Sequence, residues 1–218
     1  EFDAATLLMA AANYEQAVPV LLQFRRTYPK HRLVKDIPSK LIVAYESQEN
    51  WGDAAFELQK IWKQPGDKDK QRIALFQSAD YFEKAGDLEN ALAMYKRYAH
   101  DYKRPFNPAI EAHHKLDQIY LANGDATKRL FWMNKIVWLH LGAKKDMTDR
   151  SKYLAAKASY ELAENERIKF DKVKINSAKV FGLLAKSGIL VRKMDVYGIK
   201  NSLRITIGTT SENNALMK

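Results

Sequence analysis

An alanine recurs every 37 residues in the first half of the chain, and each copy starts the same apolar pattern. Four and seven residues after each alanine comes a large apolar residue, the spacing that puts three side chains on one face of an α-helix. The three sets are Ala17, Leu21, Phe24; Ala54, Leu58, Ile61; and Ala91, Tyr95, Tyr98. One such unit cannot bury its apolar face alone, so the period predicts a stack of similar helical units.

Each of these helices follows another apolar-periodic segment, so the repeating unit is a helix pair. The segment "ALFQSADYFEKAG" (74–86) ends at Gly86, which tolerates a positive φ, and Asp87 can cap the next helix. Equivalent aromatic residues stand near the ends of the first helices at Tyr45, Phe82 and Tyr120. Prolines, which punctuate helical chains, fall between the pairs at Pro29, Pro65 and Pro105.

A fourth pair is predicted at 109–123 and 126–141, followed by a closing helix at 147–166. In the fourth pair, Lys128 and Arg129 stand where the small packing residue belongs. We therefore expect the two helices of this pair to splay apart. The closing helix would cover the apolar end of the stack.

These residues resemble the tetratricopeptide repeat family over about 1–165. "ANYEQAVPVLLQFRRTYP" (12–29) carries nearly all of the family pattern: a small-residue turn, alanine, larger apolar residues and a closing proline. The period of 37 exceeds the family norm, so longer loops are expected between pairs. The resemblance implies a superhelix whose first helices line a concave groove that holds a protein or peptide partner.

The family pattern places one set of polar residues on the concave face, where they could contact a partner. These predicted groove residues are Lys40, Glu46, Gln77, Asp80, Lys84, His114, Lys115 and Gln118. Their charges are of both signs, which favours a specific polar peptide over a simple acidic tail.

Composition narrows the other classes of function. The formal net charge is +10, but basic and acidic residues are mixed, so a nucleic-acid or anion binder is only the second alternative. The chain has no cysteine, and His113 and His114 are adjacent on a helix and point apart, so no metal site is expected. No apolar run is long enough for a membrane span. The long-period repeats favour a bacterial periplasmic or envelope-associated protein over a cytoplasmic one.

The pattern changes after about residue 168. "RIKFDKVKI" (167–175), "ILVRKM" (189–194) and "SLRITIG" (202–208) alternate in the manner of strands, with "SAKVFGLLAKSG" (177–188) and "SENNALMK" (211–218) as short helices. The sequence thus predicts a mostly α protein: a helix-pair superhelix over 1–166, then a small α+β unit over 167–218.

Residues from about 178 onward resemble the end of fold-type I pyridoxal-phosphate enzymes, closest to histidinol-phosphate aminotransferases. The resemblance implies that Arg204, in "LRITIG", binds a substrate carboxylate. The cofactor lysine in its Ser-x-x-Lys setting is missing, and "PSK" (38–40) lacks the glycines that should follow. A pyridoxal-phosphate enzyme needs that lysine. We interpret the segment as a transplanted or fused piece and expect no cofactor and no enzymatic activity, with an aminotransferase fragment as the first alternative.

Overall fold

The computed structural model describes residues 1–143, 146–172, 191–193 and 203–205. The chain divides into two compact units, 1–162 and 163–218, each of which is described by itself. The elements of the first unit, in chain order, are α1 (Phe2–Ala10), α2 (Tyr14–Thr27), the 3₁₀ helix η1 (Arg32–Asp36), α3 (Ile37–Ser47), α4 (Trp51–Lys63), α5 (Lys68–Lys84), α6 (Leu88–Asp101), α7 (Phe106–Ala122), α8 (Ala126–Ala143) and the start of α9 (Asp149–Lys172).

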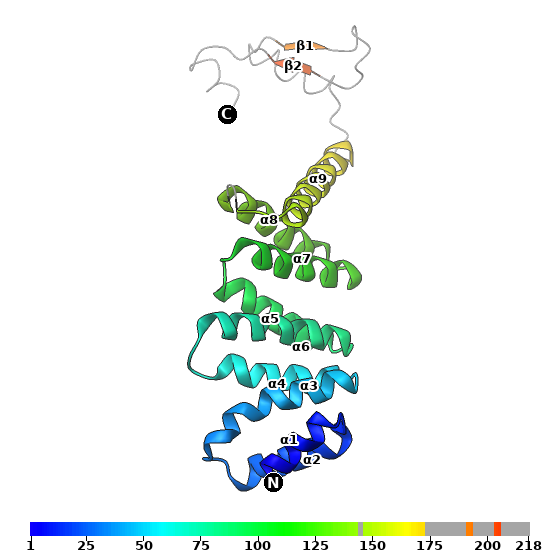
Figure 1. Cartoon of the computed structure of the whole chain (residues 1–218). Coiled ribbons are helices and arrows are strands. Elements are labelled where there is room, and N and C mark those ends of the chain that lie inside the picture. The colour runs from blue at the N-terminus through cyan, green and yellow to red at the C-terminus, as the bar shows by residue number, and fades with distance from the viewer. Residues whose placement is uncertain (144–145, 173–190, 194–202, 206–218) are drawn as a thin grey trace. The chain divides into compact units, whose positions relative to one another are not determined.

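Four helix pairs stack in sequence order in the first unit: α1 with α2, α3 with α4, α5 with α6, and α7 with α8 (Figure 1). The second helix of each pair also packs against the first helix of the next pair. Pro29, Pro65 and Pro105 all lie between pairs, as the sequence predicts. The helix pairs predicted from the repeat are therefore confirmed.

The turn inside each pair has the same backbone geometry in every repeat. The residue before the cap has a positive φ: 54° at Ala12, 54° at Glu49, 78° at Gly86 and 70° at Gly124. The next residue accepts a hydrogen bond from the backbone N–H three residues on; these caps are Asn13, Asn50, Asp87 and Asp125. Two of the four turns thus hold a non-glycine residue in the left-handed region, where a Cβ is strained.

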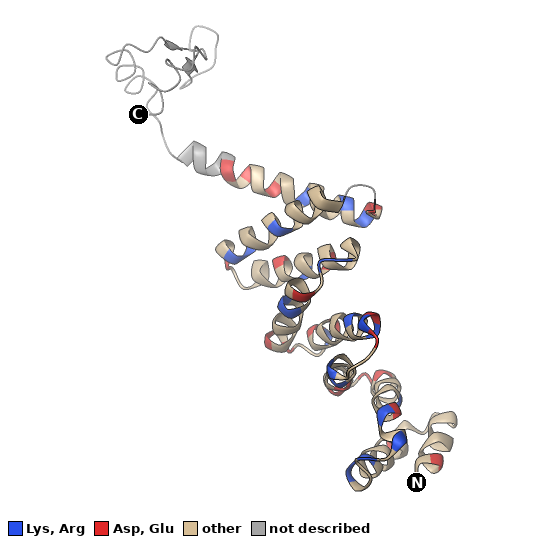
Figure 2. Ribbon diagram, turned by 90° about the vertical axis from the view of Figure 1, so that its left-hand side faces the viewer, with Lys and Arg blue, Asp and Glu red and all other residues tan. Residues whose placement is uncertain are grey.

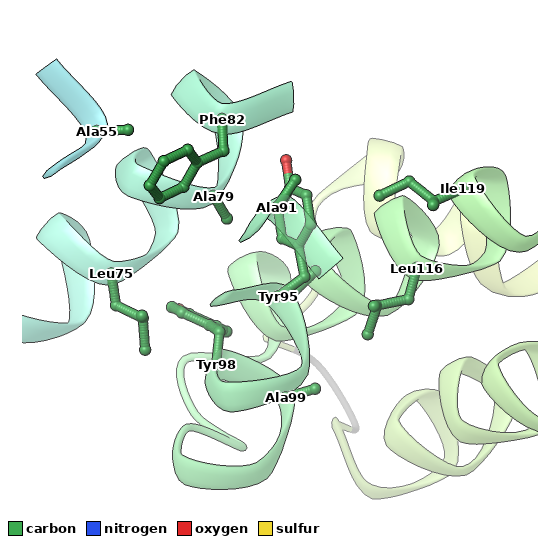
Figure 3. Packing of buried hydrophobic residues seen from close by; sticks show 11 residues of the cluster. Ala55, Leu75, Ala79, Phe82, Ala91, Tyr95, Tyr98, Ala99, Leu116 and Ile119 are labelled. Carbon is green, nitrogen blue, oxygen red and sulfur yellow. The ribbon is translucent and has the colours of Figure 1, made fainter. Parts of the chain in front are cut away.

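The core runs through the stack as a series of connected clusters. Ala17, Ala54 and Ala91 are fully buried, so the second helix can approach the first closely. In the cluster between α5 and α7, Tyr95 and Tyr98 of α6 are fully buried between side chains of both neighbouring helices (Figure 3). These two tyrosines show that α6 packs through one face against α5, its partner in the pair, and against α7, the first helix of the next pair.

The fourth pair does not splay as expected. Met133, Ile136 and Leu139 of α8 are buried against α7, in a cluster that also takes in Leu154 and Ala158 of α9. The pair tolerates Arg129 in place of the small residue because the guanidinium is paired with a carboxylate of α7, Asp117.

The predicted strand at 167–175 is wrong for residues 167–172, which continue α9. No glycine or proline interrupts the chain from Asp149 to Lys172, so nothing ends the helix there. Further on, β1 (Val191–Lys193) and β2 (Leu203–Ile205) pair as antiparallel strands within two of the three runs expected to be extended. The remainder of the predicted α+β unit lies outside the described residues, and the boundary between 166 and 167 stays a prediction.

Candidate interaction surface

The predicted groove residues all lie on first helices of the last three pairs. Lys40 and Glu46 are on α3; Gln77, Asp80 and Lys84 are on α5; His114, Lys115 and Gln118 are on α7. Glu46 of α3 contacts α5, and Lys115 of α7 contacts α5 in turn. The side chains of three successive first helices therefore form one connected polar row.

The centre of this row is a group that we call the Tyr95 cluster: Asp80, Glu83, Tyr95 and Lys115. The hydroxyl of Tyr95 lies 2.7 Å from Glu83 Oε2 and also contacts Asp80 Oδ1. Lys115 Nζ lies 3.0 Å from Glu83 Oε2 and 3.6 Å from Asp80 Oδ1. A tyrosine hydroxyl has one proton to donate, so the two carboxylates share it, and Lys115 contacts both of them.

The Tyr95 cluster carries one more negative charge than positive, and its charged side chains are about one-third exposed. Burial opposes the charge on Lys115, but its hydrogen bonds to Glu83 and Asp80 and their charges raise the pKa of Lys115. Burial, together with the same two carboxylates, raises the pKa of Tyr95. Both shifts favour the ammonium form of Lys115 and the neutral phenol of Tyr95, and a cation added beside the two acidic side chains would complete the charge balance of the cluster.

A second group of the row, the Trp51 site, combines aromatic and charged side chains: Glu46, Trp51, Tyr81 and Lys84. The rings of Trp51 and Tyr81 meet edge to face with centroids 5.2 Å apart. Lys84 Nζ lies 4.3 Å from the centre of the Trp51 ring and 5.0 Å from that of Tyr81. Tyr81 donates to Glu46, and burial with this carboxylate raises the pKa of Tyr81 to about 12. Lys84 itself is exposed, so its ammonium is open to a partner.

The third group, the Asp117 network, holds His114 and Gln118. Asp117 is buried; its Oδ2 accepts from Gln118 Nε2 at 2.8 Å and lies 3.8 Å from His114 Nδ1. Its Oδ1 accepts from Arg129 Nε at 3.1 Å, and Arg129 also contacts Glu161 of α9. Burial lowers the pKa of His114, although Glu111 and Asp117 act against this. His114 and Gln118 therefore lie beside Asp117 on the same helix, and it is Asp117 that joins α7 to α8 through Arg129.

The last two predicted groove residues lie apart from these groups. Lys40 Nζ is 5.4 Å from the centre of the Phe2 ring and is half-buried. Gln77 is exposed, and its side chain makes no hydrogen bond to another described residue. Lys84 and Gln77 are therefore the two predicted residues most open to solvent.

In the first two groups, sequence reasoning missed four members: Trp51, Tyr81, Glu83 and Tyr95. Glu83 could have been found, because Glu46 and Glu83 are 37 residues apart and each reaches a side chain on the next first helix. Tyr95 could not, because its spacing marks it only as a core residue. Its buried ring carries a hydroxyl that emerges among the carboxylates.

The remaining sequence predictions concern an anion site at Arg204, metal binding and membrane spans. Arg204 lies on β2, where its backbone pairs with Arg192 of β1. Among the described residues, no group of three histidine or acidic side chains is placed to hold a metal ion. In the same part of the chain, no helix is long and apolar enough to cross a membrane. Basic and acidic residues are interspersed along the helices (Figure 2).

Comparison with known proteins adds one match. Residues 73–104 match the tetratricopeptide repeat family model. This span takes in most of α5 and all of α6, and so the helices that carry most of the Tyr95 cluster. No curated protein and no solved structure matches the chain. The tetratricopeptide resemblance is thus supported for one helix pair, and the aminotransferase resemblance stays a prediction.

Proposed function

We propose that the chain is a non-enzymatic protein-interaction scaffold that holds a partner peptide or helix along the polar row of α3, α5 and α7. The proposal rests on the contacts between successive first helices. Tyr81 of α5 donates to Glu46 of α3, and Lys115 of α7 donates to Glu83 of α5. In this reading the pairs form a tetratricopeptide-like superhelix and the first helices face its groove. The family to which the matched span belongs typically binds proteins and is typically without catalytic activity.

The two groups at the centre of the row define what the partner should carry. The Tyr95 cluster, with its excess negative charge, would accept a lysine or arginine of the partner. At the Trp51 site, the aromatic rings would contact an apolar side chain of the partner, and the exposed ammonium of Lys84 would bind a neighbouring carboxylate. A partner segment with a basic residue and an acidic-apolar pair therefore fits the row.

Charge reversal at Lys84 can test partner binding without disturbing the fold, whereas charge reversal at Lys115 cannot. Reversing the charge of Lys115 would bring a third carboxylate up to Asp80 and Glu83, so a loss of binding could reflect a loss of folding. Lys84 is exposed and lies in the last turn of α5, and Lys63 is equally an exposed lysine in the last turn of α4. Lys63→Glu is therefore a matched control for Lys84→Glu.

The experiment is affinity capture from a native extract, identification of the retained protein, and titration of that protein against the two variants. We expect Lys84→Glu to weaken binding at least about tenfold, which corresponds to one charge-assisted contact, and Lys63→Glu to bind as the parent does. Equal binding by both variants, with unchanged helicity, would show that the row is not the docking surface.

A further inference from the structure

A pocket of about 430 Å³ opens between α6, α7 and α8, and shares no residue with the predicted groove. Its lining contains three aromatic residues of α8: Phe131, Trp132 and Trp138. Phe131 is 51% exposed and Trp138 is 59% exposed, so large apolar surface remains open to solvent here. Exposed tryptophan and phenylalanine around a pocket are typical of a surface that another molecule covers.

The charged side chains of the pocket are basic. Lys96, Lys103 and Lys135 line it, and none of the three forms an ion pair with a described residue. Lys135 Nζ lies 5.2 Å from the centre of the Phe131 ring, and Lys103 Nζ lies 5.9 Å from that of Trp138. The nearby carboxylate of Asp101 is held by Arg97 and His100, so it does not neutralise these lysines.

His113 supplies a directed acceptor in the lining. It is 4% exposed, and its ring packs edge to face against Trp132 at 5.4 Å. Burial lowers the pKa of His113, so the ring is neutral, and Nδ1–H donates to the carbonyl of Ala109 at 2.7 Å. Nε2 is then an acceptor, and it makes no hydrogen bond to another described residue. Because His113 lines the pocket, its Nε2 is an acceptor to which a donor on a ligand can bind in place of water.

We propose that this pocket binds an acidic protein segment that carries a tyrosine, with the tyrosine hydroxyl donating to His113 and the flanking carboxylates facing Lys96, Lys103 and Lys135. The tyrosine ring would pack against Trp132 and Trp138. A segment with acidic residues on both sides of one aromatic residue matches both the charge and the apolar surface of the site. The proposal concerns a second surface and does not depend on the polar row of α3, α5 and α7.

The test is a titration of the ¹⁵N-labelled full chain with the peptide acetyl-Glu-Asp-Tyr-Glu-Asp-amide, followed at the indole N–H signals of Trp132 and Trp138. We expect saturable shifts with a Kd no weaker than about 1 mM. Lys135→Glu should weaken binding about tenfold, whereas Lys70→Glu, which makes the same charge change on an exposed site of α5, should not. Replacing the peptide tyrosine by phenylalanine should weaken binding about fivefold, because the acceptor on His113 is then left unpaired.

Four results would overturn the proposal. They are no saturable shift, equal shifts with acetyl-Lys-Lys-Tyr-Lys-Lys-amide, equal losses from Lys135→Glu and Lys70→Glu, and the same shifts from acetate alone at the same carboxylate concentration. Shifts that depend on protein concentration without any peptide would instead assign the pocket to a second copy of the chain, and so would also overturn it.

Discussion

Arg129 Nε lies 3.1 Å from Asp117 Oδ1, at two positions where the preceding repeat carries Ala91 and Ala79. The third pair joins its helices there through two fully buried alanines, and the fourth joins them through an ion pair. Asp117 is 4% exposed, so its charge depends on Arg129 and on the amide of Gln118. Because Arg129 also contacts Glu161, the same guanidinium ties the closing helix α9 to the stack.

Arg129→Ala should destabilise the chain by about 2–4 kcal/mol, because it leaves the buried carboxylate of Asp117 without its cation. Asp117→Ala should cost less, since Arg129 keeps Glu161 and is partly exposed. The double variant restores the two alanines of the preceding repeat and should be more stable than Arg129→Ala alone. Urea unfolding of the parent chain and the three variants gives the free energies of unfolding for this double-mutant cycle. Strict additivity of the two single changes would contradict a direct coupling between the residues.

The repeat could be predicted from sequence because one face of each second helix recurs every 37 residues, and the small residues at Ala17, Ala54 and Ala91 proved to be buried. The ion pair in the fourth pair could not, since the period shows only that a small residue is missing at Arg129. The period does not show that Asp117, on the other helix of the pair, replaces the alanine of the preceding repeat in the same way.

The predicted groove residues lie on first helices, because helix order in a repeat follows from the period; their role in binding stays a prediction. Their contacts were not predicted, because these depend on how far successive first helices lie from one another. Lys115 reads as a free groove residue in the sequence, yet it holds Glu83 at 3.0 Å. The strand expected at 167–175 is wrong over 167–172 for a different reason: a short run with apolar residues at alternate positions does not distinguish a strand from the end of a long helix.

The left-handed residue in the turn of each pair gives the next prediction. Glu49 has a φ of 54° and is exposed, whereas Gly86 at the equivalent position has a φ of 78°. Glu49→Gly should stabilise the chain by about 0.5–1 kcal/mol by removing the strain of the Cβ. Gly86→Ala should destabilise it by a similar amount, although no atom crowds the new Cβ, which isolates the backbone effect. Thermal and urea unfolding would check both; a loss of stability in Glu49→Gly would argue against strain at this turn.

Tyr95 and Tyr98 provide a matched pair of buried hydroxyl groups. The single hydroxyl proton of Tyr95 is shared between the carboxylates of Asp80 and Glu83, whereas the hydroxyl of Tyr98 accepts from Arg72 Nη1 at 3.3 Å. Tyr95→Phe should therefore destabilise by about 1–3 kcal/mol, and Tyr98→Phe by about 1 kcal/mol or less. Both rings are fully buried, so the packing change is the same and the difference in free energy of unfolding reports the hydroxyl contacts. An equal effect of the two changes would mean that the Tyr95 cluster adds nothing to stability.

Burial of His113 and His114 makes stability depend on pH. Burial lowers the pKa of both imidazoles from the ordinary value of 6.5. The unfolded chain therefore binds more protons near pH 6 than the folded chain does, so the free energy of unfolding should fall as the pH falls from about 7.5 towards 5.5. Asp87, Asp101 and Asp125 have pKa values below their usual 3.8, so their contribution is lost only at lower pH and does not overlap this window.

The measurement is urea unfolding at pH 7.5 and pH 5.5 for the parent chain and for His113→Asn, His114→Gln and the double variant. Asparagine at 113 can still donate to Ala109 O but cannot gain a charge, so the loss of stability on acidification should shrink. Lys70→Gln, an exposed change that removes no imidazole, should keep the full loss and serves as the control. His113 should account for the larger part, because its side chain is the more deeply buried of the two and only His114 has carboxylates beside it that favour the charged ring. If the double variant lost as much stability on acidification as the parent chain, the two buried rings would not be the groups that resist protonation.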